Sequence, residues 1–423
     1  MKKLITFLSF CGLLTFGTLT LAAPERVIHS FGNGNDGYDP RGGLIFDASG
    51  NAYGTTAAGG TFSEGTVFEL SPTQSGPWTE TILYNFAGGS DGAGPIAGLV
   101  LDAQGNLYGT TQSFGDCNGC GTVFELSPTG GGAWTETTIH NFSNKGSDGW
   151  NTQAGLVIDS QGNLYGTTQF GGSYIGTCAN GCGTVFELSP DGGGTWTENI
   201  IFAFNESDGE SPQTGLTFDS SGNLWGTVNT ESGDGTVYEL SPASGGTWTF
   251  NAAYNFCSRG CQDNIGGPSS GVIFDGQGNM YGETFGGGTG KPCTQNTGCG
   301  AVYELSPAGG GTWTLSAVHV FAPKDGRVPV GGVILDLRGN LYGVAQYGWI
   351  PGPKCGKVGC GGVFELSPQG NGQWTETVLH KFGIRKDGKT PRVGVVMDVA
   401  GNLYGTTTAG GGAKGGTVYR VVH

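Results

Sequence analysis

Short apolar runs alternate with polar, glycine-containing turns along most of the chain. In residues 98–142, an apolar run at 98–101 is followed by the polar turn Asp102-Ala-Gln-Gly-Asn106 and by a second run at 106–111. Such short runs, bounded by Asp, Asn and Gly and without a 3.6-residue period, favour β-strands joined by tight turns. The pattern therefore predicts an all-β chain.

The same unit contains two more predicted strands. The third covers residues 121–126, and Ser127-Pro128 is expected to end it, because proline cannot donate to a central ladder. A glycine-rich turn leads to the fourth strand, from Trp134 to Phe142. The unit thus reads as a four-stranded antiparallel meander.

The Asp-x-x-Gly-Asn turn recurs at intervals of 55 to 62 residues. Its seven copies begin at Asp47, Asp102, Asp159, Asp219, Asp275, Asp336 and Asp398. A period of this length with strand-forming residues is typical of propeller blades. Stacked blades bury both of their apolar faces, which a lone sheet cannot do. We therefore predict a seven-bladed β-propeller with four antiparallel strands in each blade.

The two ends of the chain complement each other. The seventh repeat stops after residues 417–421 and lacks the fourth strand, whereas Glu25–Phe31 matches Glu376–Phe382 of the sixth repeat. We expect this N-terminal strand to pair with the last blade and close the ring. Residues 24–423 then form a single domain.

The repeat Asp102-Ala-Gln-Gly-Asn-Leu-Tyr-Gly-Thr110 resembles the glycine-rich GloVer repeats of secreted bacterial proteins. It is also similar to the blade motifs of sensor-type propellers. The resemblance covers about residues 24–423 and implies a propeller, but it implies no activity and no cofactor.

The first residues predict export. Lys2 and Lys3 precede an apolar run that ends at Ala22 and Ala23, as in a signal peptide covering residues 1–23. An uncleaved anchor and lipidation of Cys11 are the alternatives, and Phe10 disfavours the second. No later segment has the roughly 20 apolar residues that span a bilayer. We expect a secreted, extracellular or periplasmic monomer without membrane insertion.

The net charge of the chain limits the classes of partner that it is expected to bind. Without the two leader lysines the chain has 17 basic and 34 acidic side chains, a net charge of −17. Such a surface repels polyanions, which argues against nucleic acid and anionic membranes as partners.

The ten cysteines after the leader fall into five closely spaced pairs. In an exported chain this spacing predicts disulfides that hold loop shape. A four-thiolate zinc site made by two neighbouring pairs is the alternative. The pairs are Cys117 and Cys120, Cys178 and Cys182, Cys257 and Cys261, Cys293 and Cys299, and Cys355 and Cys360.

Strand direction assigns the connections to two faces. The two short, uniform turns of each repeat share one face. The second-to-third loops and the blade-to-blade crossovers share the other, which we call the loop face. Variable loops on a constant scaffold commonly bind ligands. The crossovers carry Asp-Gly at Asp36, Asp91, Asp148, Asp208, Asp325 and Asp387, either as turn residues or as a carboxylate ring around the entrance.

Aromatic residues mark the predicted loops. Trp349 is the strongest candidate, because no other repeat has a comparable residue in this loop. Exposed rings suit sugars or peptide side chains, whereas rings that fold inward would cap the blade ends. The binding candidates are Trp150, Phe114, Phe170, Tyr174, Tyr347 and Trp349, and the same loops contain Phe62 and Phe285.

Catalytic signals are sparse. The chain lacks a nucleophile elbow and a zinc-helix motif. Glu283 replaces a threonine of the second strand near the axis and is the catalytic candidate. His29, His140, His319 and His380 share one outer-strand position, where we expect edge-strand residues and no metal.

These features predict a binding module that recognises an extracellular glycan or protein through the loop face. A hydrolase or lyase acting on polysaccharide and a purely structural extracellular component are the alternatives. A panel of polysaccharides, tested for retention and for released reducing ends, separates the three.

Overall fold

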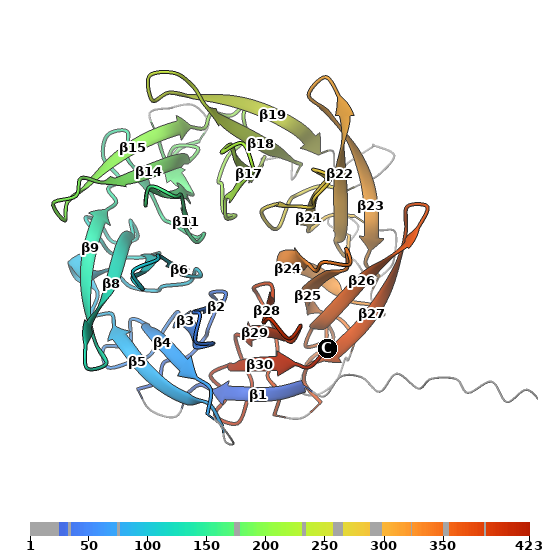
Figure 1. The fold of residues 1–423 in the computed structure, drawn as a ribbon, viewed down its shortest axis with the longest axis horizontal. Helices are drawn as coiled ribbons and strands as arrows, with labels where there is room; N and C mark the ends of the chain where they lie inside the picture. Colours follow the sequence, from blue (N-terminus) through green and yellow to red (C-terminus); the bar gives the residue numbers. More distant parts are fainter. Residues whose placement is uncertain are drawn as a thin grey trace, which may run out of the picture.

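Seven antiparallel sheets of four strands surround a central axis (Figure 1). The computed structural model describes residues 25–32, 35–73, 77–172, 178–230, 234–256, 265–287, 298–322, 324–349, 355–384 and 386–423. The predicted seven-bladed propeller is confirmed. The predicted signal peptide lies outside the described residues. Within these ranges, no helix has the length and apolar character needed to cross a membrane.

In each blade the first strand lies nearest the axis and the last strand lies at the outer edge (Figure 1). Blade 1 contains β2 (Ile45–Phe46), β3 (Ala52–Thr56), β4 (Thr66–Ser71) and β5 (Thr79–Asn85). Blade 2 contains β6 (Val100–Leu101), β7 (Leu107–Thr111), β8 (Thr122–Gly130) and β9 (Ala133–Asn141). Blade 3 contains β11 (Val157–Ile158), β12 (Leu164–Thr168), β14 (Thr184–Pro190) and β15 (Trp196–Ala203). Blade 4 contains β16 (Thr217–Phe218), β17 (Leu224–Asn229), β18 (Gly235–Pro242) and β19 (Trp248–Phe256).

The remaining blades follow the same order. Blade 5 contains β20 (Ile273–Phe274), β21 (Met280–Thr284), β22 (Ala301–Gly309) and β23 (Thr312–Val320). Blade 6 contains β24 (Arg327–Leu335), β25 (Leu341–Tyr347), β26 (Gly362–Gly370) and β27 (Gln373–Lys381). Blade 7 contains β28 (Val396–Met397), β29 (Leu403–Thr407), β30 (Thr417–Val421) and β1 (Glu25–Ser30). Outside the blades lie the strand pair β10 (Gly149–Trp150) and β13 (Phe170–Gly171) and the 3-10 turn η1 (Gly89–Asp91).

The recurring aspartate stabilises the inner hairpin of each blade. In blade 2, Asp102 Oδ1 accepts hydrogen bonds from the backbone N–H groups of Gln104 at 2.9 Å and Asn106 at 2.8 Å. Its Oδ2 accepts from Asn106 Nδ2 at 2.8 Å and from the Tyr108 hydroxyl at 3.1 Å. Gly105 adopts a φ of 87°, which the tight turn requires. The constant spacing of Asp, Gly and Asn within the motif therefore reflects the geometry of one hydrogen-bonded turn.

The core lies between the flat faces of neighbouring blades. Between blades 1 and 2, Val67 and Phe86 pack with Phe124 and Leu126, and all four side chains are fully buried. A Cβ added to Gly109 would lie 2.5 Å from the Phe124 ring, so this glycine allows the ring to pack against the backbone. This packing accounts for the glycine in each Tyr-Gly-Thr segment.

The N-terminal strand closes the ring, as predicted. In Figure 1, β1 lies at the outer edge of blade 7, and it pairs antiparallel with β30 from Glu25 opposite Val421 to Ser30 opposite Thr417. The backbone N–H of Phe31 donates to the carbonyl of Gly416 at 3.0 Å. Phe31 is fully buried, and its ring centroid lies 5.0 Å from that of Phe68 in blade 1.

The predicted end of the third strand is wrong. β8 continues through Pro128, which pairs with Trp134 of β9. The pairing of β7 with β8 ends at Leu107 and Leu126. Beyond that point β8 has one partner strand, so the missing N–H of proline removes no ladder hydrogen bond.

Candidate binding site on the loop face

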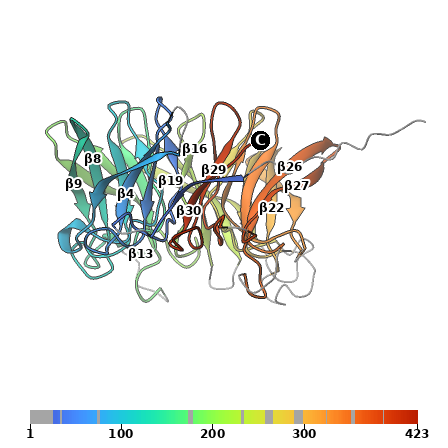
Figure 2. The ribbon, with the colours of Figure 1, turned by 90° about the horizontal axis from the view of Figure 1, so that it is seen from below.

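The crossovers and the second-to-third loops meet on one side of the ring, as the strand directions predicted. Tyr38 of one crossover bridges Ala58 of the adjoining loop, and β10 pairs with β13 in the same way. Figure 2 shows β13 and the long connections below the strands, with the hairpin tips above them.

A cavity of about 480 Å³ opens on the axis. Its wall consists of the segments that precede the first strand of each blade, which in blade 6 lie within β24 itself. Phe285, which follows β21, and Gln346, near the end of β25, complete the wall. These positions place the cavity at the loop-face end of the axis. The polar side chains of the wall are Arg41, Gln153, Gln213, Thr214, Ser269, Ser270, Gln346 and Arg392.

The polar side chains of the cavity differ in whether they already have a hydrogen-bond or ion-pair partner within the protein. Arg41 pairs with Asp39, with Nη2 at 2.7 Å from Oδ2. Gln153 donates to the Oδ1 of Asn151 at 2.9 Å. Gln346 is only 8% exposed, and Arg392 is exposed. Within the described ranges, neither Gln346 nor Arg392 has a side-chain hydrogen bond.

The cavity wall contains few acidic groups compared with the rest of the protein. Among the described residues that line it are two arginines and neither aspartate nor glutamate, whereas the whole chain has a net charge of −15. Arg41 is balanced by its ion pair with Asp39, so Arg392 is the arginine of the wall that has no ion pair among the described residues. The wall thus combines cationic and amide donors with the Phe285 ring, which is 43% exposed.

The predicted aromatic residues are spread around the loop face. Trp150 and Phe170 pack together with ring centroids 4.6 Å apart, and both are half buried. Phe114 is also half buried. These three rings are packed within blades 2 and 3, and the structure does not place them at the axial cavity.

The blade 6 aromatics pack inward. The indole of Trp349 contacts Gly326 and Gly362 and belongs to the partly buried edge of a core cluster, and Tyr347 is half buried. This is the arrangement expected for rings that cap a blade end. Tyr174 lies outside the described residues. The sequence singled out neither Gln346 nor Arg392, although both directly flank segments that it assigned to the loop face.

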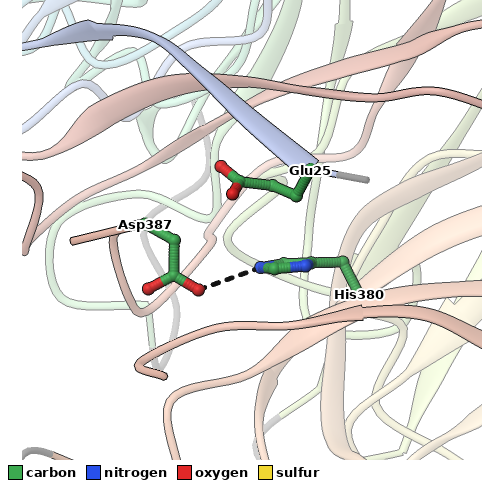
Figure 3. A group of neighbouring side chains, drawn as sticks. All are labelled: Glu25, His380 and Asp387. Carbon is green, nitrogen blue, oxygen red and sulfur yellow. Dashed lines mark hydrogen bonds and ion pairs between the residues drawn. The ribbon is translucent and has the colours of Figure 1, made fainter. Parts of the chain in front are cut away.

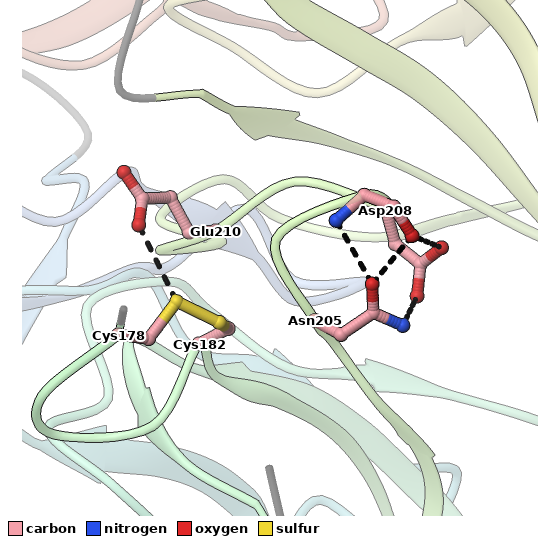
Figure 4. The surroundings of a disulfide bond; sticks show 6 residues. Cys178, Cys182, Asn205, Asp208 and Glu210 are labelled. Carbon is pink, nitrogen blue, oxygen red and sulfur yellow. Dashed lines mark hydrogen bonds between the residues drawn. A yellow bond between two sulfur atoms is a disulfide. The ribbon is translucent and has the colours of Figure 1, made fainter. Parts of the chain in front are cut away.

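Three of the predicted disulfides are present: Cys117–Cys120, Cys178–Cys182 and Cys355–Cys360. Cys299 is also disulfide-bonded, while Cys257, Cys261 and Cys293 lie outside the described residues. The zinc alternative is wrong for the three described pairs, because their sulfurs are not thiolates. Figure 4 shows Cys178–Cys182 beside Glu210, whose Oε2 lies 3.5 Å from the Cys178 sulfur.

Glu283 lies behind the cavity wall and joins two blades. The side chain is fully buried, and its Oε2 accepts a hydrogen bond from the backbone N–H of Gly332 at 2.8 Å. At the same position in blade 1, Thr55 donates to the carbonyl of Ala97 in the next blade. Burial raises the pKa of Glu283 to about 8. The structure does not place its carboxyl in the cavity.

The crossover aspartates do not form a ring around the entrance, which corrects the carboxylate-ring alternative. Four of them instead lie at the outer rim beside the outer-strand histidines. In Figure 3, His380 of β27 hydrogen-bonds Asp387 at 3.1 Å, with Glu25 of β1 above them. Burial, reinforced by the charge of Asp36, raises the pKa of Glu80 in the equivalent group to about 8.

Comparisons with known proteins agree with this architecture. A family model described as the Gloeobacter/Verrucomicrobia repeat matches residues 15–234, 135–291 and 229–423. The search of curated proteins found no match to the sequence.

Two solved structures show the same fold at low identity. A PL25 polysaccharide lyase, an ulvan lyase bound to -[GlcA(1-4)Rha3S]-, is 12% identical with a TM-score of 0.56, over 91% of this chain and 94% of that one. An ancestral GH74 enzyme is 13% identical with a TM-score of 0.57, over 92% of this chain and 48% of that one.

Proposed function

From the premise that this chain belongs to the Gloeobacter/Verrucomicrobia repeat family, we propose that it is an extracellular binding module for acidic saccharides. The ligand enters the axial cavity from the loop face. The observation that carries the proposal is the composition of the cavity wall, whose described residues include two arginines, three glutamines and an exposed phenylalanine but no carboxylate.

Each part of that wall suits a uronic-acid residue. A guanidinium group binds a carboxylate through paired, charge-assisted hydrogen bonds. Amide side chains donate to and accept from sugar hydroxyls, and the apolar face of a sugar ring packs on an aromatic side chain. The cavity volume of about 480 Å³ falls within the roughly 300–1,000 Å³ of small-ligand sites. The ulvan lyase supports an acidic glycan as a ligand class for this fold, since the oligosaccharide bound to it contains glucuronic acid.

Arg392→Gln is expected to weaken the binding of uronic-acid-containing oligosaccharides about tenfold or more, because a charged hydrogen bond contributes roughly 1.5–3 kcal/mol. Titration calorimetry against acidic and neutral oligosaccharides measures this difference. Neutral glucans are expected to bind weakly to both proteins.

Arg338→Gln is the matched control, because it makes the same charge change in an exposed Asp-x-x-Gly turn on the opposite face. Equal losses in the two variants would refute binding at the cavity and point to a nonspecific charge effect. Release of reducing ends or unsaturated products during the same incubations would establish an enzyme. If no polysaccharide of the panel is either bound or cleaved, the result would favour the purely structural role.

A further inference from the structure

In the part of the chain that the structure describes, four junctions between neighbouring blades contain the same group of side chains at the outer rim. An imidazole comes from the outermost strand of one blade and a carboxylate from the following crossover. A second carboxylate comes from the outermost strand of the next blade. The groups are His29–Asp36–Glu80, His140–Asp148–Glu198, His319–Asp325–Glu376 and Glu25–His380–Asp387.

Strand register makes these groups equivalent. His140 pairs with Val123 beside a β-bulge, and Glu198 pairs with Leu188 in the next blade. The bulge re-aims the side chain that follows it. Two residues after His140, the buried ring of Phe142 packs edge-on at 4.6 Å and orients the imidazole. The same edge-on His–Phe contact recurs for His29, His319 and His380.

The spacing of the polar atoms fits the coordination shell of a metal ion. His29 Nε2 lies 3.4 Å from Asp36 Oδ2 and 3.4 Å from Glu80 Oε1. The corresponding distances are 3.7 and 3.5 Å at His140, and 4.0 Å for both at His319. Zinc bonds of about 2.0–2.2 Å place two tetrahedral ligand atoms about 3.3–3.6 Å apart. Good hydrogen bonds are shorter than most of these distances.

Several of these atoms are buried and lack a hydrogen bond. Within the described part of the chain, this holds for the Nε2 atoms of His29, His140 and His319 and for the Oε1 atoms of Glu80 and Glu198 that face them. In the third group the oxygen without a hydrogen bond is Oε1 of Glu376, while its Oε2 faces the histidine. Buried polar atoms are nearly always hydrogen-bonded or bound to an ion. These atoms recur at equivalent positions in the propeller, which indicates a repeated site with ligand atoms available for a cation.

Junctions without histidine provide an internal comparison. Between blades 1 and 2, Tyr84 replaces the histidine and donates its hydroxyl proton to Asp91 at 2.8 Å. Between blades 3 and 4, Phe202 and Phe250 replace the histidine and the glutamate and stack at 4.5 Å. At these two junctions the described side chains contact one another directly, whereas each of the four outer-strand histidines faces a glutamate of the next blade.

We propose that each His–Asp–Glu group binds a divalent transition-metal ion, with Zn²⁺ as the best match, and thereby fastens neighbouring blades. An imidazole nitrogen favours zinc over calcium, which prefers six to eight oxygen ligands. Two carboxylates balance the charge of the ion. The closing strand β1 supplies His29 to one group and Glu25 to another, so two of the ions would secure the ring closure. This proposal is independent of the saccharide site.

The test uses the untagged chain, freed of metal with a chelator and passed through gel filtration before and after incubation with Zn²⁺. Mass spectrometry is expected to find close to four bound zinc ions per chain, one for each group. The melting temperature is expected to rise on zinc addition and to fall again with chelator. Each of Glu80→Gln, Glu198→Gln and Glu376→Gln should remove about one ion.

Glu136→Gln is the matched control, because Glu136 occupies the equivalent position beside Tyr84 and should leave zinc uptake unchanged. If Glu198→Gln does not fold, the double change His140→Phe and Glu198→Phe copies the Phe202–Phe250 junction and should also lose one ion. Folded wild-type chain that retains no zinc, or equal loss of zinc in Glu136→Gln, would overturn the proposal.

Discussion

Deletion of residues 24–31 is expected to leave the chain without a stable fold at room temperature, so that no cooperative unfolding transition is observed on heating. The deletion removes the outer strand of blade 7, exposes the edge of β30 and empties the site of Phe31. Losing one buried phenylalanine typically costs about 3–5 kcal/mol, while whole domains are stable by roughly 5–15 kcal/mol. The lost strand adds backbone hydrogen bonds and the burial of Ile28 to that cost.

Calorimetry and circular dichroism of the purified chain measure this effect. Phe31→Ala alone is expected to lower the free energy of unfolding by about 3–5 kcal/mol. Arg26→Gln, at an exposed position of the same strand, is the control and should leave the melting temperature nearly unchanged. An unchanged melt after the deletion would contradict closure of the ring by β1.

Glu283→Gln is expected to remove the part of the pH dependence of stability that this one buried carboxyl group contributes between pH 5 and pH 9. Burial raises the pKa of Glu283 from 4.5 to about 8 in the folded chain. Between these values the unfolded chain releases a proton that the folded chain keeps, so wild-type stability falls as the pH rises towards 8. At about 1.4 kcal/mol per pKa unit, this loss amounts to roughly 4–5 kcal/mol, and the amide of the variant does not titrate.

Urea unfolding at pH 5 and pH 9, with chelator present, measures this difference. The variant should gain stability relative to wild type at pH 9 and little at pH 5. Glu304→Gln, at a half-buried position in the neighbouring strand, serves as the control for general loss of a carboxylate. The same pH slope in wild type and Glu283→Gln would show that the carboxyl reaches water, and would favour the catalytic alternative.

Most of the scaffold could be predicted from the sequence because it is encoded locally and repeated. Asp102, Gly105 and Asn106 form one turn, and seven copies of it reveal the blades. The match between Glu25–Phe31 and Glu376–Phe382 revealed the closure, since both segments have the same position in a blade. Cysteines only three to five residues apart likewise predicted the three described disulfides.

The outer-rim groups were missed because their members come from different repeats. His140 and Glu198 are 58 residues apart, and the sequence analysis treated each as a separate edge-strand residue. A signal was available, since a histidine in one repeat coincides with a glutamate in the next at each of these junctions. The alternative that placed the crossover aspartates in a ring around the entrance was wrong for a related reason, because strand direction specifies the face of a turn but not its distance from the centre.

Residue order alone determined the blade, the number of blades, the closing strand and the loop face, since each depends on contacts between neighbours or on exact repetition. Only the tertiary structure decided which side chains share the axial cavity and the rim. Arg41 and Arg392 meet there from opposite ends of the chain. Their approach depends on the diameter of the ring and the register between blades, and both are set by the packing of all seven sheets together.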